Sequence, residues 1–170
     1  LAILAVKPQN LQEVLADIRP NMDSHVVMSI VAGATIDTLT KGLDHTAVVR
    51  VMPNTPAQIG AGMTVWTASP EVSAKAMGTV RSILSTLGDE LHVEDEKLID
   101  MATALSASGP AYVFLFIEAL VDAGVYLGMP RSVAHQLAIQ TVAGSTRLVQ
   151  ESGRHPAELK DMVTSPGGTT

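Results

Sequence analysis

The ten residues Ala47-Val48-Val49-Arg50-Val51-Met52-Pro53-Asn54-Thr55-Pro56 decide the fold class of this chain. The run from Ala47 to Met52 is short, apolar and rich in β-branched residues, which is typical of a buried strand. Two prolines then end it. In an open α/β sheet, ligands bind beyond the carboxyl ends of the strands. The loop from Pro53 to Pro56 is therefore a candidate binding segment.

Two similar runs precede this stretch, from Leu1 to Val6 and from Val26 to Ala32. A helical pattern follows each of them, and Asn10 and Thr35 stand where the side chain of a helix N-cap is expected. Strands that alternate with helices through short linkers predict a parallel sheet with right-handed crossovers. The first part of the chain is therefore expected to be an α/β structure.

The pattern changes near Glu94. Before it, a strand from Met63 to Thr67, a helix that begins at Pro70 and ends at Gly88, and a strand from Glu90 to Val93 are expected. After it, only helical spacing remains, with breaks at 106–110, 128–130 and 153–156. We therefore predict the fold class α/β plus all-α, with a first domain at residues 1–94 and a second at 95–170.

Composition excludes several classes of protein. The chain has 170 residues, of which 46% are hydrophobic and 16% charged, and this favours a folded core over disorder. Its net charge of −6 and its lack of a basic cluster argue against a nucleic-acid partner. It has no cysteine, so disulfides and thiolate metal sites are excluded, and its histidines lack metal-ligand spacing. No apolar run reaches the roughly 18 residues of a membrane span, so no membrane partner is expected.

Few residues suggest chemistry on their own, and no acid–base pair stands out. The Thr-Ser-Pro-Gly-Gly-Thr-Thr stretch at 164–170 has glycines that permit close approach of backbone to a ligand, although it also fits an ordinary turn. Ser106 and Ser108 interrupt a helix, either as a cap or as hydroxyls that face a cofactor. Lys7 fits a solvated loop or a ligand contact. His155, which precedes a proline, fits a helix cap.

Five motifs together resemble the pyrroline-5-carboxylate reductase family over practically the whole chain. The most specific are SGPAY and KDMVTSPGGTT. In order, the five are LAVKPQ (4–9), VMPNTP (51–56), LSASGPAYVF (105–114), ALVDAGVYLGMPR (119–131) and HPAELKDMVTSPGGTT (155–170).

The resemblance implies a partial Rossmann-like parallel sheet followed by a helical dimerisation domain. It implies a cytoplasmic oxidoreductase that reduces 1-pyrroline-5-carboxylate to L-proline, the last step of proline biosynthesis, with NADPH as the cofactor and NADH as the alternative. It also implies an intertwined homodimer, in which the Rossmann domain of one protomer works with the helical domain of the other, and further assembly of dimers into decamers.

The same resemblance assigns roles to residues. Thr170 would hydrogen-bond the imine nitrogen, and the amides of Gly168 and Thr169 would bind the substrate carboxylate. The other expected substrate residues are Val163, Ser165 and Gly167. The expected cofactor residues are Ala5, Val6, Lys7, Pro8, Val31, Ala32, Gly33, Asn54, Thr55, Pro56, Ser106 and Ala107.

The chain departs from the family pattern at several places. Ala107 stands where glycine is usual, and Gly153 stands where some members have a glutamate, with Glu151 close by. The strands that carry the family's GxGxxG-type loop, and the helices that follow Thr170 in the family, are not in this sequence, so a partial copy of the enzyme is expected. Two alternatives stay open, namely a non-catalytic helical assembly module and a reductase of a different imine or hydroxyacid.

Overall fold

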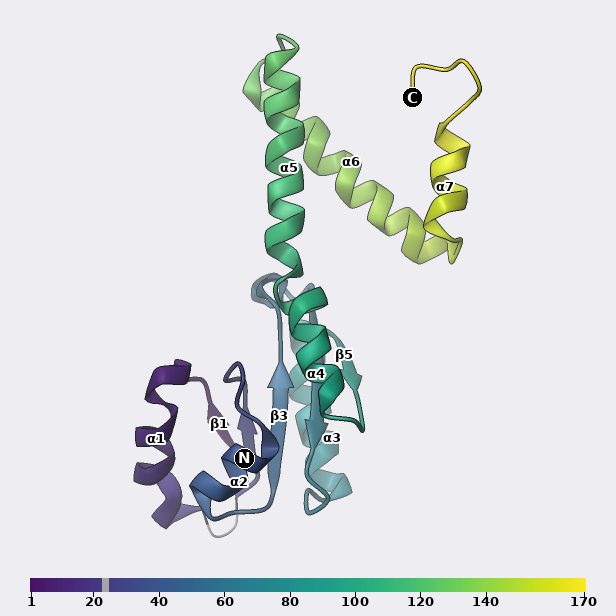
Figure 1. The fold of residues 1–170 in the computed structure, drawn as a ribbon. Coiled ribbons are helices and arrows are strands. Elements are labelled where there is room, and N and C mark those ends of the chain that lie inside the picture. Colours follow the sequence, from purple (N-terminus) through teal and green to yellow (C-terminus); the bar gives the residue numbers. More distant parts are fainter. Residues whose placement is uncertain (23–24) are drawn as a thin grey trace. The chain divides into compact units, whose positions relative to one another are not determined.

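The computed structural model describes residues 1–22 and 25–170, in two compact units, Leu1–Pro110 and Ala111–Thr170 (Figure 1). Within the described residues, the first unit holds one five-stranded sheet in the order β1-β2-β3-β4-β5. The strands are β1 (Ala2–Leu4), β2 (Val27–Ser29), β3 (Val48–Met52), β4 (Gly62–Ala68) and β5 (Gly88–His92).

The sheet is mostly parallel, as the alternating pattern predicts, but one pair differs. Strands β1, β2 and β3 run parallel, and β5 runs parallel to β4, whereas β4 is antiparallel to β3. The β3–β4 connection, residues 53–61, contains only the short 3-10 segment Thr55–Ile59. A parallel pair needs a crossover of a dozen or more residues, so this connection permits only an antiparallel return. The expectation of a uniformly parallel sheet is therefore wrong at this pair.

Helices cover both faces of the sheet. In β3, Val48, Arg50 and Met52 share one face because side chains alternate along a strand, and this face packs against α1, α2 and α4. Val49 and Val51 point to the other face, toward α3. The helices of this unit are α1 (Leu11–Ile18), α2 (Ile36–Leu43), α3 (Ala74–Leu84) and α4 (Lys97–Ala102).

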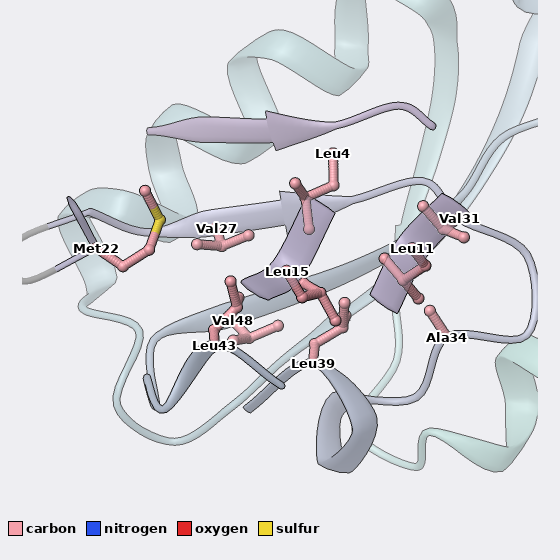
Figure 2. Packing of buried hydrophobic residues seen from close by; sticks show 10 residues of the cluster. All are labelled: Leu4, Leu11, Leu15, Met22, Val27, Val31, Ala34, Leu39, Leu43 and Val48. Atoms are coloured by element: carbon pink, nitrogen blue, oxygen red, sulfur yellow. The ribbon is translucent and has the colours of Figure 1, made fainter. Parts of the chain in front are cut away.

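The main core lies between β1–β3 and helices α1 and α2. Figure 2 shows Leu15 and Leu39 from the two helices near Val48 of the central strand. Burial of such aliphatic side chains stabilises the fold by roughly 1.5–3 kcal/mol each. The whole cluster consists of Leu4, Leu11, Leu15, Met22, Val27, Val31, Ala34, Leu39, Leu43 and Val48.

The opposite face contains the single tryptophan of the chain. Trp66 of β4 is fully buried, and its Nε1 donates a 2.5 Å hydrogen bond to Glu90 Oε2. The ring of His92 lies 4.5 Å from the Trp66 ring, centroid to centroid. Arg81 of α3 places its guanidinium 5.9 Å above the same ring and pairs with Glu90 at 3.0 Å. These four side chains tie β4, β5 and α3 together.

Most helix ends follow the sequence signals. Thr35 caps α2 by accepting a hydrogen bond from the Thr38 N–H, and His155 Nδ1 accepts from the Ala157 N–H at the start of α7, so both predictions are confirmed. Asn10 makes no such bond, because a 3-10 turn at Pro8–Asn10 leads directly into α1. The expected helix start at Pro70 is wrong, because α3 begins at Ala74 with Ser73 as its N-cap.

The second unit consists of helices. Its small core joins Val121 of α5 to Ala134 and Ala138 of α6. The small side chains of these two alanines permit close packing of the two helices. The helices are α5 (Gly109–Tyr126), α6 (Arg131–Ser152) and α7 (Pro156–Val163); α5 begins just before the boundary between the units.

The helical stretch Lys97–Tyr126 is unusually apolar. It has 30 residues, and an 18-residue window within it has a mean hydropathy of 1.6, so it is long and apolar enough to cross a membrane by length and composition alone. This finding differs from the expectation based on uninterrupted apolar runs. A core helix of a soluble protein passes the same test, but only 6% of this apolar window is buried within the chain. Exposed side chains include Phe114, Leu115 and Tyr126, and an apolar surface of this kind is typical of an interaction site.

Candidate functional site

A pocket of about 510 Å³ lies at the edge of the sheet where β2 and β3 end. The residues just after these parallel strands form two of its walls, and the residue Ala107 forms a third. Its volume is in the range of ordinary small-molecule sites. The pocket is lined by Ile30, Met52, Pro53, Asn54, Thr55, Ala57, Gln58, Leu87 and Ala107.

Asn54 holds two of these walls together. Its Oδ1 accepts a 2.9 Å hydrogen bond from the N–H of Met63, in β4, and its Nδ2 donates to the carbonyl oxygen of Ser106 at 3.3 Å. The side chain therefore closes the β3–β4 loop and anchors the segment that carries Ala107. Both ends of the Asn54 amide are engaged in the protein itself.

The segment Thr103–Ala107 is a π-turn between α4 and α5. The Ser108 N–H donates to the carbonyl of Thr103 at 2.9 Å, which is the wide i→i−5 bond of such a turn. Single π-turns inside helices are frequent at functional sites, because the extra residue turns neighbouring groups outward. Here the turn holds Ser106 and Ala107, two residues singled out from the sequence.

The structure brings only some of the predicted cofactor residues into this pocket. Asn54, Thr55 and Ala107 line it, and Ser106 contacts Asn54. The segments 5–8 and 31–33 follow β1 and β2 at the same edge of the sheet but do not line the pocket. Pro56 lies within the β3–β4 loop beside it.

Three of the predicted cofactor positions differ in the groups that they present to a ligand. Val31 is buried in the main core, and its backbone is engaged as well, because its N–H donates to Ser29 Oγ at 3.2 Å and its carbonyl accepts from the Ala34 N–H at 3.2 Å. Gly33 has a φ of 76°, a left-handed conformation that favours glycine, and it turns the chain from β2 toward α2. Lys7 is exposed just after β1, so its ammonium is free to reach an anionic ligand.

Sequence reasoning missed a group of charges beneath the pocket. Arg50 of β3 has a side chain only 4% exposed, and its Nη1 and Nη2 donate to Glu96 at 2.8 Å and to Asp100 at 2.6 Å. Burial alone lowers the pKa of Arg50, but the hydrogen bonds and charges of the two carboxylates outweigh it and raise this pKa above the usual value. The signal in the sequence was an arginine in the middle of an apolar strand.

The 164–170 stretch forms a turn after α7. The Gly168 N–H donates to the carbonyl of Ser165 at 2.9 Å, and Gly167 between them has a φ of 72°. A proline followed by a left-handed glycine is the pattern of a type II turn. The Gly168 amide, which is expected to bind a carboxylate, is therefore engaged within the turn in this structure.

The predicted substrate residues and the predicted cofactor residues belong to different units. Val163, Ser165, Gly167, Gly168, Thr169 and Thr170 are in the helical unit, and the cofactor positions are all in the α/β unit. Each group is therefore described within its own unit. Among residues 1–22 and 25–170, no three histidine, cysteine or acidic side chains gather as a metal site would require.

Comparisons with known proteins agree on one family. Residues 96–170 match the family model described as pyrroline-5-carboxylate reductase dimerisation. The chain is 48% identical over 168 residues to a pyrroline-5-carboxylate reductase of Synechocystis and 46% identical to one of Escherichia coli; it is covered to 99% and 98% and spans 62% of each relative. It is also similar to a Plasmodium falciparum pyrroline carboxylate reductase solved with NADP bound, with a TM-score of 0.93 and 38% identity over 98% of this chain and 67% of that one.

Proposed function

This chain belongs to the pyrroline-5-carboxylate reductase family, and on that basis we propose that the protein reduces 1-pyrroline-5-carboxylate to L-proline with NADPH. The observation that carries the proposal is the pocket at the ends of β2 and β3, whose walls include the π-turn. The chain spans less than two thirds of the length of its curated relatives, so the activity is proposed for the protein at its full natural length.

The pocket fits the nicotinamide end of such a cofactor. Its lining is mainly apolar, with Asn54, Thr55 and Gln58 as polar groups, which suits a flat ring that carries one amide. The nearby ends of β1 and β2 supply backbone groups and the Lys7 ammonium for the remainder of the nucleotide. The P. falciparum structure with NADP bound supports NADPH as the cofactor, with NADH as the alternative.

The reaction asks little of side-chain acids and bases. When bound, the reduced nicotinamide supplies a hydride to the imine carbon, and the nitrogen takes a proton as the C=N bond becomes a single bond. The protein has to align the two reactants, which can lower the barrier by roughly 7–11 kcal/mol. This accounts for a site without a histidine–carboxylate pair.

We assign substrate binding to the loop after α7. The Thr170 hydroxyl holds the imine nitrogen, and the amides of Gly168 and Thr169 hold the carboxylate. For Gly168 this requires that its hydrogen bond to Ser165 be shared or exchanged when substrate binds. Val163, Ser165 and Gly167 complete the loop and set its shape.

The proposal extends to organisation and location. The division into a cofactor domain at 1–94 and a helical domain at 95–170 is proposed for the full-length protein. Its assembled form is a homodimer, or a decamer built from such dimers. The apolar surface of α5 and the match to a dimerisation family model support self-association. We propose a cytoplasmic location, without nucleic-acid or membrane partners.

A direct assay tests the proposal. The full-length protein is mixed with 1-pyrroline-5-carboxylate and either NADPH or NADH, and oxidation of the cofactor is followed by absorbance, with proline measured as the product. We expect proline to form, faster with NADPH. Binding of neither cofactor would favour the assembly module, and turnover only with other cyclic imines or hydroxyacids would favour a different reductase.

A further inference from the structure

The carboxylate of Glu96 joins two segments that are far apart in the sequence. Its Oε1 accepts a 2.8 Å hydrogen bond from the backbone N–H of Ile36, the first residue of α2. The same oxygen accepts from Arg50 Nη1, also at 2.8 Å. Because the first N–H groups of a helix have no partner inside it, Glu96 serves as a second cap for α2 beside Thr35.

Arg50 fixes this carboxylate in place. It lies on the central strand, is almost fully buried, and remains charged, so its partners are held firmly against the sheet. Asp100 is one helical turn beyond Glu96 and binds the other nitrogen of the same guanidinium. The two acids therefore share an anchor, but only Glu96 also reaches α2.

The two segments joined at Glu96 each lead to a residue that lines the pocket. Residues 30–35 connect β2 to α2, and Ile30 at the start of this connection lines the pocket. In the second segment, α4 begins right after Glu96 and continues into the π-turn, whose last residue Ala107 lines the pocket too. A shift of α4 relative to α2 would change the distance between these walls.

We propose that Glu96 is a positioning residue for the cofactor: it links the N-terminus of α2 to α4 through Ile36 and Arg50 and thereby sets the spacing of the 30–35 loop and the π-turn. The inference rests on the proposed function, because the spacing matters for a ligand in this pocket. It assigns Glu96 no contact with the cofactor or the substrate.

The test compares three variants of the full-length protein. Glu96→Ala removes both hydrogen bonds, Glu96→Gln keeps an amide oxygen as the acceptor, and Asp100→Ala is the matched control because it removes one partner of Arg50 and leaves Ile36 capped. The readouts are the Kd of NADPH measured without imine, the steady-state KM and kcat, the Tm, and hydrogen exchange of peptides that cover residues 30–43.

We expect Glu96→Ala and Asp100→Ala both to lower Tm, since each leaves Arg50 with a single partner. Only Glu96→Ala should weaken NADPH binding, by about 10-fold or more, in line with the effect of a small misplacement of positioning groups. Only Glu96→Ala should also speed exchange at the start of α2. Glu96→Gln should restore NADPH binding to within about 3-fold of the wild type, because the acceptor is present again.

The inference is overturned if Glu96→Ala and Asp100→Ala change NADPH binding and exchange to the same extent. That outcome would make Glu96 one of two equivalent partners of a structural arginine. Failure of the proposed function looks different, because the wild-type protein itself would then bind no nicotinamide cofactor. In that case the exchange data still decide whether Glu96 holds the start of α2.

Discussion

Asn54 connects the β3–β4 loop to the π-turn through a single side chain. Its amide oxygen accepts a hydrogen bond from the Met63 N–H, and its amide nitrogen donates one to the Ser106 carbonyl. Asn54 therefore holds two walls of the pocket together. The resemblance to the family suggests that Asn54 lines the nicotinamide, and its two hydrogen bonds give it a structural part as well. A substitution that keeps one of these hydrogen bonds and removes the other can measure how much Asn54 contributes to stability.

Asn54→Asp keeps the acceptor for Met63 but places a carboxylate oxygen opposite the carbonyl of Ser106, where a donor stood. We expect a loss of about 1–3 kcal/mol in the free energy of unfolding, because a partly buried acceptor loses its donor and faces a carboxylate oxygen instead. Gln58→Glu is the matched control: it makes the same chemical change in the same pocket wall, at an exposed residue. Urea denaturation measures both, and equal stability of the two variants would contradict the bridging role.

Thr170→Val keeps the shape of the side chain and removes the hydroxyl that we assign to the imine nitrogen. This nitrogen becomes more basic as the hydride arrives, so the hydrogen bond should strengthen toward the transition state. We expect kcat/KM of the full-length enzyme for the imine to fall roughly 10- to 100-fold, about 1.4–2.7 kcal/mol, with little change in NADPH binding. Wild-type kcat/KM in this variant would show that the hydroxyl is structural.

Side chains that pair over long distances are the part of the site that the sequence could not predict. Asn54 stood out because of its prolines and its place after a strand, but nothing local indicates that it reaches Ser106. Arg50 is 46 residues from Glu96 and 50 residues from Asp100 in the sequence. Their pairing depends on α4 packing over β3, which only the folded chain reveals.

At the scale of the elements, β4 and β5 meet at two glycines beside the pocket. Gly62 pairs with Gly88, and Gly88 has a φ of 130°. A Cβ atom at Gly88 would lie 2.2 Å from the carbonyl oxygen of Gly62, which no side chain tolerates. The two strands therefore approach each other here only because both residues are glycine.

Gly88→Ala is expected to destabilise the α/β unit by about 1–3 kcal/mol or more, through the unfavourable φ and the clash with backbone. Gly78→Ala is its counterpart in α3, where an added methyl group meets nothing within 4 Å. It should stabilise the protein by about 0.5–1 kcal/mol, since alanine favours a helix more than glycine does. Thermal unfolding of the two variants should shift Tm in opposite directions; a Gly88→Ala variant with the wild-type Tm would contradict the expectation.

Periodicity and turn residues predicted nearly every strand and helix of this chain, because the apolar runs have the length and spacing of the elements they form. The direction of β4 was missed, although the short 53–61 connection contains the signal for it. The π-turn was predicted only as a break in a helix. The carbonyl of Ser106 within this turn accepts from Asn54, a contact across 52 residues that lies outside the local pattern.

At the scale of the whole molecule, the helical unit exposes many large apolar side chains and buries few. Phe114, Leu115 and Phe116 on α5 are each more than half exposed, whereas the small core of the unit depends on Val121. An exposed surface of this kind is characteristic of an interface. A second copy of the chain is the partner that the proposed function implies.

We expect the full-length protein to be a dimer or a larger oligomer at micromolar concentration. Leu115→Glu should shift it toward the monomer, because a charge would be buried without a partner in the interface. Gln150→Glu, at an exposed polar position of α6, is the control that adds the same charge. Light scattering measures the mass. A well-folded wild-type monomer would contradict the expectation that a second copy of the chain buries the apolar surface of α5, and so would sedimentation of the protein with lipid vesicles.

The placement of Trp66 has a practical consequence for spectroscopy. The only indole of the chain lies inside the α/β unit, against His92 and beneath Arg81, while the helical unit contains none. Intrinsic tryptophan fluorescence therefore reports the unfolding of the sheet alone, whereas the far-ultraviolet circular dichroism is dominated by the helices. Two denaturation curves recorded on one sample, one by each signal, will coincide if the units unfold together and separate if each unfolds on its own.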